Sequence, residues 1–307
     1  MYHLTSVPET MANESLVASP PPFLSLSSKE HDLEVLPLID MANLERFIQP
    51  IMRHWGYDEA GAENFIQSIR RTAGAVCRII SPLGLGTGTL LQLRYKDMPL
   101  IITNKHIIKN QKTVMVQFDY DADGQLGTML EADATNAIGQ DDKSFFSYCA
   151  LPVRDPYNIL VGRGIQVGTG ECQLYNDKTW AAFDARPLVV FLVAHTGGGV
   201  KRVSVSHIYP KPKNDAERIY FHHFLATRNG SSGACIMTPL LSTDEGGAKL
   251  SFNHCEALFL HHEKHPDDNP TNFTHNTAIG FVYMFMHLRD IINSSTTKAV
   301  VTSTQPA

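Results

Sequence analysis

The feature that most limits the fold is the pattern of apolar residues between positions 75 and 285. Short apolar runs alternate there with Gly, Asn and Asp, as in strands joined by turns. No helical pattern separates the runs, which favours antiparallel sandwiches or barrels over a parallel α/β sheet. The strand candidates are Val76–Ile80, Gly88–Leu93, Leu100–Thr103, Thr113–Phe118, Phe145–Leu151, Leu188–Ala194, Arg202–Ile208, Ala234–Met237, Glu256–Leu260 and Ala278–Met284.

Helical periodicity appears on both sides of this region. Asp40–Trp55 and Tyr57–Ala75 each place apolar residues on one face, and Phe285–Ile292 predicts a closing helix. Residues 1–39 are rich in Ser, Pro and Glu and predict a flexible tail. We therefore expect a tail over 1–39, a helical segment over 40–74, a β domain over 75–285, and a short helix with a mobile end over 286–307.

Composition excludes several classes of protein. Hydrophobic residues make up 43% of the 307 residues and charged residues 19%, enough apolar material for a core and too much for a wholly disordered chain. The net charge of −5 argues against a nucleic-acid partner. No apolar run is long enough to cross a membrane, so no membrane partner is expected.

The cysteines and the N-terminus bear on the compartment. Five scattered cysteines form no CxxC pair, which favours reduced thiols. The N-terminus lacks a basic flank followed by an apolar stretch, so no signal peptide is predicted. Together these features predict a cytoplasmic or nuclear protein.

Two stretches carry candidate chemistry. In Gly230-Ser231-Ser232-Gly233 a serine stands between glycines, which suits an exposed nucleophile on a tight turn with converging N–H groups. Taken alone, the same letters also describe an ordinary loop. In Leu100–Ile108 an apolar strand ends in a polar corner that carries His106. An isolated histidine there is equally consistent with local hydrogen bonding.

Together, the two stretches resemble the trypsin-like (chymotrypsin-fold) serine peptidases over about residues 75–285. Gly86-Thr87-Gly88 is similar to the Gly-x-Gly strand of the family's first barrel. Thr103-Asn104-Lys105-His106 is similar to its Thr-x-x-His corner, and the Gly230–Gly233 stretch to its nucleophile loop. The resemblance implies a mostly β fold of two antiparallel six-stranded barrels, at about 75–155 and 187–285, with N-terminal helices and a C-terminal helix.

The resemblance also implies roles. His106 would be the general base and Ser232 the nucleophile of an endopeptidase that acts through an acyl-enzyme. The backbone N–H groups of Gly230 and Ser232 would form the oxyanion hole. A polypeptide would be the substrate, with no cofactor. The cysteines that flank the site in digestive members are absent here, where Ile107 and Arg228 stand in their places, as expected of a non-secreted branch.

The third member of the triad stays open. The family's acid precedes a strand of the form Asp-apolar-small-apolar-apolar, and two registers compete here. Asp142 keeps the acid, with Asp141 as a neighbouring candidate, whereas the register that fits the strand better puts Phe145 at the acid's position. The third possibility is that no functional acid exists.

Substrate preference follows from the same resemblance. Ala226 would lie at the base of the primary pocket, with Thr227 and His261 on its wall. An uncharged base disfavours Lys and Arg, and a His with a hydroxyl favours Glu, Asp or Gln, as in the glutamyl endopeptidases that the chain resembles. An apolar pocket is the alternative, suggested by Phe259 and Leu260 nearby.

Two other functions are weighed against the peptidase. A catalytically impaired module would bind peptides or serve as a scaffold, and the Phe145 register favours it. A viral-type polyprotein-processing protease would share the fold. The run His261-His262-Glu263-Lys264-His265 does not match His-Glu-x-x-His, so no metal is predicted. The sequence leaves the oligomeric state open.

Overall fold

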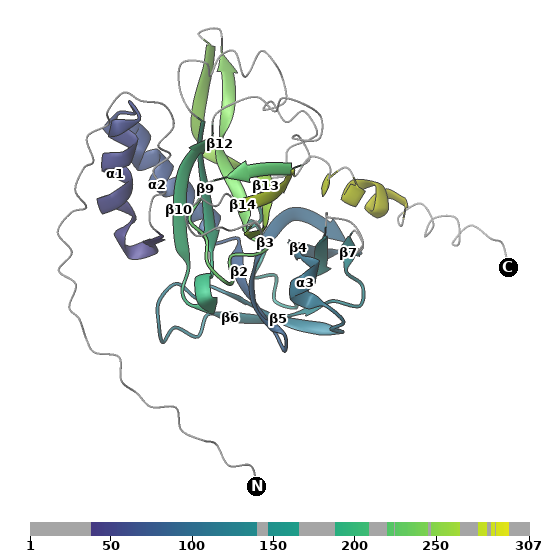
Figure 1. Cartoon of the computed structure of the whole chain (residues 1–307). Coiled ribbons are helices and arrows are strands. Elements are labelled where there is room, and N and C mark those ends of the chain that lie inside the picture. Colours follow the sequence, from purple (N-terminus) through teal and green to yellow (C-terminus); the bar gives the residue numbers. More distant parts are fainter. Residues whose placement is uncertain are drawn as a thin grey trace, which may run out of the picture. The chain divides into compact units, whose positions relative to one another are not determined.

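The computed structural model divides the chain into two units, residues 1–34 and 35–307, and every residue that it describes lies in the second. These described residues are 38–139, 147–165, 188–208, 220–223, 225–244, 247–264, 276–280, 284–285 and 287–294. They form two antiparallel β-sheets with a few helices (Figure 1).

The first sheet comes from the N-terminal half of the β region. Its strands follow the order β6-β5-β2-β3-β4-β8-β7. An isolated bridge pairs Ala132 of β6 with Val153, just after β8, so the sheet curls until two of its outer parts meet. The strands are β2 (Val76–Ser81), β3 (Gly84–Tyr95), β4 (Met98–Asn104), β5 (Thr113–Phe118), β6 (Thr128–Asp133), β7 (Ile138–Gly139) and β8 (Tyr148–Pro152).

The second sheet follows the order β1-β10-β9-β12-β13-β14-β11. β1 belongs to a segment that precedes the helices, and it covers the free edge of β10, with Ile39 opposite Val203. The strands are β1 (Ile39–Asp40), β9 (Leu188–Ala194), β10 (Arg202–Ile208), β11 (Tyr220–His223), β12 (Cys235–Asp244), β13 (Gly247–Lys264) and β14 (Asn276–Gly280).

Two helices lie against the second sheet, α1 (Leu44–His54) and α2 (Glu59–Ala73) (Figure 1). Asp58 caps α2 by accepting a hydrogen bond from the Gly61 N–H at 2.7 Å. Phe65 of α2 and Phe191 of β9 are fully buried and meet edge to face, with ring centroids 5.5 Å apart. This contact extends the core of the second sheet into the helical segment.

The C-terminal helix, residues 284–285 and 287–294, packs against the first sheet instead. The Tyr148 hydroxyl of β8 lies 2.5 Å from His287 Nδ1, and Leu288 is fully buried. Burial raises the pKa of Tyr148 above its ordinary value. Within the described part of the chain, no helix combines the length and apolarity needed to cross a membrane.

The mostly β fold and its two antiparallel sheets agree with the sequence-based expectation. The candidates 188–194 and 202–208 coincide with β9 and β10. The described residues give seven strands in each sheet, where six were expected. β6 was missed because only Leu130 and Ala132 of its six residues are buried, too few for a clear alternation. Ile39, expected at the end of the tail, is paired in β1.

We expect Phe65→Ala to lower the free energy of unfolding by about 3–5 kcal/mol, because it opens a cavity between α2 and β9. Asn64→Ala, at an exposed position of the same helix, should change it by less than about 0.5 kcal/mol. Denaturant titration of both variants measures the difference. Equal, small effects would mean that α2 is not part of the cooperative core.

Candidate functional site

His106 lies on a single helical turn, α3 (Lys105–Ile108), directly after β4. Every residue from Pro99 to Asn104 is buried, and Ile107 and Ile108 bury their side chains on the far side of the turn. The Ser81 hydroxyl donates a hydrogen bond to the Ile107 carbonyl at 2.9 Å. These anchors leave His106 on the outer side of the turn, where it is exposed.

The loop Arg228–Ala234, called the nucleophile loop because it carries the predicted nucleophile Ser232, holds its two serines in different surroundings. Ser231 is fully buried, and its Oγ accepts a hydrogen bond from the Arg228 N–H at 3.2 Å. Ser232 is half-buried, so part of its surface is accessible from outside the molecule. Of the two, only Ser232 therefore offers a surface that a substrate could reach.

Two glycines let the nucleophile loop approach its neighbours closely. Gly233 has φ +86°, and a Cβ there would lie 2.2 Å from Thr103 Oγ1 and 2.3 Å from the Thr87 carbonyl oxygen. Gly230 has φ +90°, and a Cβ there would lie 2.5 Å from the His195 carbonyl oxygen. Only glycine fits both positions. The loop that carries Ser232 therefore packs directly on the β4 segment that leads to His106.

The polar groups of this loop follow a clear pattern. The Gly230 carbonyl accepts from Thr87 Oγ1 (2.7 Å), and the Ser232 carbonyl accepts from the Thr87 N–H (3.0 Å). The Asn229 and Ser231 carbonyls accept from the Gly197 N–H (2.5 Å) and the Ala234 N–H (3.0 Å). Every carbonyl from 229 to 232 is thus satisfied by a group of the protein.

The N–H groups of Gly230 and Ser232 have no acceptor among the residues that the structure describes. A trans peptide holds its C=O and N–H antiparallel. Since the Asn229 carbonyl faces the Gly197 N–H, the Gly230 N–H points away from that turn. The Ser231 carbonyl orients the Ser232 N–H in the same manner. Two oriented N–H donors close to a reachable hydroxyl can bind a developing negative charge.

The residues predicted to line the substrate pocket lie around this loop. The Ala226 N–H donates to Ser204 Oγ at 2.7 Å, and Ala226 and Thr227 are half-buried just before the loop. His261 is buried, and its carbonyl accepts from both the Gly233 N–H (3.1 Å) and Asn104 Nδ2 (2.9 Å). The His261 backbone therefore connects the loop to the corner before His106.

The candidate acids Asp141 and Asp142, and Phe145 of the competing register, lie outside the described residues. The described chain resumes at Ser147, whose carbonyl accepts a hydrogen bond from the Lys105 N–H at 3.2 Å. β8 then pairs Tyr148 with Asn104. Ser147, the first described residue after this gap, therefore lies beside the residue that precedes His106.

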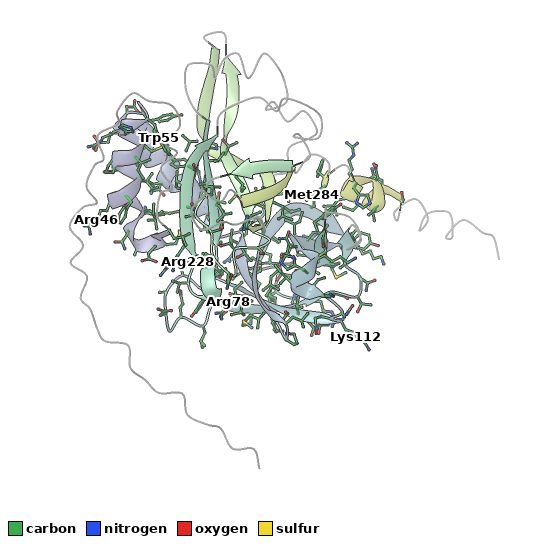
Figure 2. All side chains as sticks on the ribbon, in the orientation of Figure 1. Arg46, Trp55, Arg78, Lys112, Arg228 and Met284 are labelled. Carbon is green, nitrogen blue, oxygen red and sulfur yellow. The ribbon has the colours of Figure 1, made fainter. Side chains whose placement is uncertain are left out.

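His195 directly follows β9 and precedes the turn whose Gly197 N–H binds the Asn229 carbonyl. His195 is fully buried, its Nδ1 lies 2.9 Å from the Gly199 carbonyl, and its ring stacks on Tyr120. Arg78, labelled in Figure 2, donates to the Gly198 carbonyl at 2.6 Å and lies over the Tyr120 ring. Burial lowers the pKa of His195 to about 3, assisted by the charges of Lys201 and Arg78.

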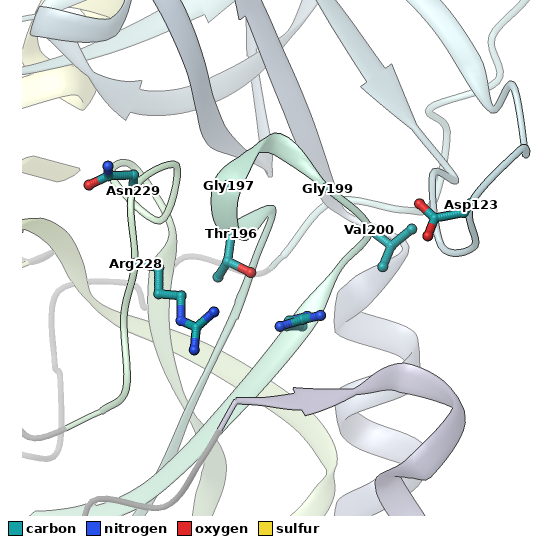
Figure 3. A pocket seen from close by; sticks show the side chains of 8 residues that line it. Asp123, Thr196, Gly197, Gly199, Val200, Arg228 and Asn229 are labelled. Carbon is teal, nitrogen blue, oxygen red and sulfur yellow. The ribbon is translucent and has the colours of Figure 1, made fainter. Parts of the chain in front are cut away.

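A cavity of about 590 Å³ opens beside the same turn (Figure 3). Arg228 and Asn229 of the nucleophile loop line one side of it. Arg202, whose Nε lies 3.0 Å from Asp40 Oδ1, also lines it. The other lining residues are Asp123, Thr196, Gly197, Gly199 and Val200. None of the residues predicted to bind substrate lines this cavity, so it is separate from the predicted pocket.

The described side chains contain no group of three or more His, Cys, Asp or Glu that could hold a metal ion. Cys77, Cys149 and Cys235 are buried, and burial raises the pKa of both Cys77 and Cys235 to about 12. These two thiols are therefore protonated and unreactive at neutral pH.

The sequence matches no known protein-family model, and no curated protein matches it. Among solved structures, the serine endoprotease from Yersinia pestis is 17% identical with a TM-score of 0.49, over 75% of this chain and 67% of its own. The Rv3671c protease from M. tuberculosis H37Rv, in an inactive form, is 16% identical with a TM-score of 0.47, over 81% and 96%.

A third neighbour, the HtrA-type protease AlgW with tripeptide, is 14% identical with a TM-score of 0.48, over 75% of this chain and 64% of its own. This chain therefore spans less than two thirds of that protein. All three neighbours are serine proteases. At these identities and scores, the function of this chain has to be argued from its own residues.

The state of His195 predicts a pH dependence of stability. Its pKa is about 3 in the folded protein, against an ordinary value of 6.5, so the unfolded chain binds more protons between these pH values. Stability should therefore fall as the pH drops from 6.5 towards 3, by up to about 1.4 kcal/mol per pH unit from this residue.

His195→Asn tests this, because an amide can replace Nδ1 as a donor and does not titrate. Chemical denaturation between pH 6.5 and 4.5 should give a shallower loss of stability in the variant than in the unmodified protein. His54→Asn, at an exposed position of α1, controls for the loss of one imidazole. Parallel pH curves for His195→Asn and the unmodified protein would refute a neutral, buried His195.

Proposed function

We propose that the chain is a serine endopeptidase of the trypsin-like kind, with two closed β-barrels and its site between them. His106 takes the proton of Ser232 Oγ as this oxygen bonds to the scissile carbonyl carbon. The carbonyl electrons move to the oxygen, which the Gly230 and Ser232 N–H groups bind. His106 then protonates the leaving amine, and water hydrolyses the acyl-enzyme by the same steps.

One observation carries this proposal. The loop before β12 is seated on the β4 corner, with Ser232 half-buried and with the N–H groups of Gly230 and Ser232 free of acceptors among the described residues. An ordinary surface loop has no need of two glycines under close contact or of four satisfied carbonyls. The arrangement matches what acyl transfer requires: a reachable hydroxyl beside preorganised donors.

The remaining parts of the proposal concern substrate and surroundings. Ala226, Thr227 and His261 would form the primary pocket for a polypeptide, with an acidic or amide side chain preferred over Lys or Arg. No cofactor or metal takes part. The buried free thiols suit a reducing compartment such as the cytoplasm or nucleus.

Asp142 is proposed as the acid that orients His106. Ser147, five residues further on, is tied to Lys105, and five residues span at most about 17 Å, enough for the segment to turn back to His106. The acid would hold the histidine tautomer and stabilise the imidazolium.

The second candidate is a catalytically impaired module that binds peptides. One observation favours it: the residue that leads into β8 beside Lys105 is Ser147, which carries no carboxylate. If the acid's position is fixed by the start of β8, His106 lacks its partner and turnover is residual.

A fluorophosphonate probe tests the nucleophile, because it labels only an activated serine. We expect the unmodified protein to be labelled, and Ser232→Ala and His106→Ala to lose labelling. Ser231→Ala, the matched control one residue away, should keep most of it, because Ser231 is buried and supports the loop. Labelling that survives Ser232→Ala but not Ser231→Ala would overturn the register.

Peptide hydrolysis by Asp142→Asn tests the acid. If Asp142 orients His106, kcat should fall about 10⁴-fold with unchanged stability, and Asp141→Asn should have little effect. Circular dichroism and denaturation verify that both variants fold. Equal activity of Asp142→Asn and the unmodified protein would reject Asp142, and very low activity of the unmodified protein itself would favour the impaired module.

A further inference from the structure

Thr87 is a fully buried residue of β3 that joins three separate segments. Its N–H donates to the Ser232 carbonyl at 3.0 Å, and its Oγ1 donates to the Gly230 carbonyl at 2.7 Å. The same Oγ1 accepts from the His195 N–H at 3.0 Å. Its carbonyl accepts from Thr103 Oγ1 at 2.7 Å, on the strand that leads to His106.

We infer that Thr87 is a positioning residue for the oxyanion hole, an inference that rests on the proposed function. Gly230 and Ser232 each carry one N–H of the proposed hole and one carbonyl that Thr87 holds. Neither residue can rotate about its backbone bonds without breaking a buried hydrogen bond. Thr87 thus fixes the peptide group that follows each donor and restrains both residues, without touching the substrate.

Gly230 depends on such an external support. It has no Cβ to restrict its backbone, and its φ of +90° is one of several conformations open to glycine. A change in the backbone angles of Gly230 would turn its N–H group out of the oxyanion hole. The bond from Thr87 Oγ1 to its carbonyl opposes that change from one side, and the bond from Gly197 to the Asn229 carbonyl opposes it from the other.

The hydroxyl has no replacement within its surroundings. A hydroxyl donates one hydrogen bond and accepts others, and Thr87 uses both functions. Its removal leaves the half-buried Gly230 carbonyl and the fully buried His195 N–H without these partners, which is costly for polar groups away from water. The loop would relieve this cost by shifting, and the shift would misplace the N–H donors of the oxyanion hole.

The test compares Thr87→Val, which keeps the shape, with Thr87→Ser, which keeps the hydroxyl. We expect Thr87→Val to lower kcat of peptide hydrolysis by about 10–100-fold with KM within about twofold, less than the 10²–10³-fold loss of a whole oxyanion donor. Thr87→Ser should restore kcat to within about threefold of the unmodified protein.

Thr89→Val is the matched control. Thr89 lies two residues further along the same face of β3 and is also fully buried. Within the described residues it makes no hydrogen bond to the nucleophile loop. Its hydroxyl makes none of the hydrogen bonds that the Thr87 hydroxyl makes, so its substitution should cost less stability than Thr87→Val and should leave kcat unchanged. If Thr87→Val does not fold, Thr87→Ala takes its place as the variant without the hydroxyl.

A second readout separates this inference from the proposed function. Amide hydrogen exchange of Ser231, Gly233 and Ala234, whose N–H groups are hydrogen-bonded within or beside the loop, should be faster in Thr87→Val than in Thr89→Val, whether or not the protein hydrolyses peptides. If the unmodified protein shows no hydrolysis, the proposed function fails, and hydrogen exchange alone then decides whether Thr87 holds the nucleophile loop in place. Unchanged kcat and exchange in Thr87→Val, or failure of Thr87→Ser to restore them, would overturn the inference.

Discussion

The contact between Gly233 and the first sheet is the one on which the rest of the site depends. No side chain fits there, because Thr103 Oγ1 and the Thr87 carbonyl occupy the space that a Cβ would take. The position of Gly233 sets the start of β12, where Cys235 pairs with Leu260, and brings the Gly233 N–H to the His261 carbonyl. The same carbonyl binds Asn104 Nδ2, so one backbone group of the second sheet connects both candidate catalytic segments.

Behind the nucleophile loop, buried positive charge is paired with a carboxylate, a carbonyl and an aromatic ring. Lys201 is fully buried, and its Nζ lies 2.9 Å from Asp121 Oδ1. Arg78 uses the Gly198 carbonyl, Gln117 and the Tyr120 ring. A third positive charge in this cluster would be unfavourable, and the lowered pKa of His195 keeps its ring neutral. The turn at 195–199 therefore keeps one electrostatic state across the pH range in which the proposed chemistry would run.

Much of the fold follows from sequence periodicity, and the site follows only in part. Leu188–Ala194 is a continuous apolar run, as in a buried strand, whereas Arg202–Ile208 alternates valines with serines, as in a strand with one apolar face. Thr87 was noted only as the middle letter of Gly-x-Gly, since its role depends on carbonyls more than a hundred residues away. The resemblance implied Ser232 as the nucleophile, and the difference in burial between Ser231 and Ser232 is an observation that no local pattern encodes. The acid stays a prediction, because Asp141 and Asp142 lie outside the described residues.

The direction of the two free N–H groups is set from both sheets. From the second sheet, the turn after β9 donates through Gly197 to the Asn229 carbonyl. From the first sheet, Thr87 binds the Gly230 and Ser232 carbonyls, and Arg78 binds the Gly198 carbonyl of that same turn. A relative shift of the sheets would therefore strain these bonds together. Thr87 Oγ1 and the Arg78 guanidinium bind the same turn, at the His195 N–H and at the Gly198 carbonyl. The effects of removing these two groups should therefore not add. The oxyanion geometry is thus a property of the interface between the sheets, and the loop sequence alone cannot specify it.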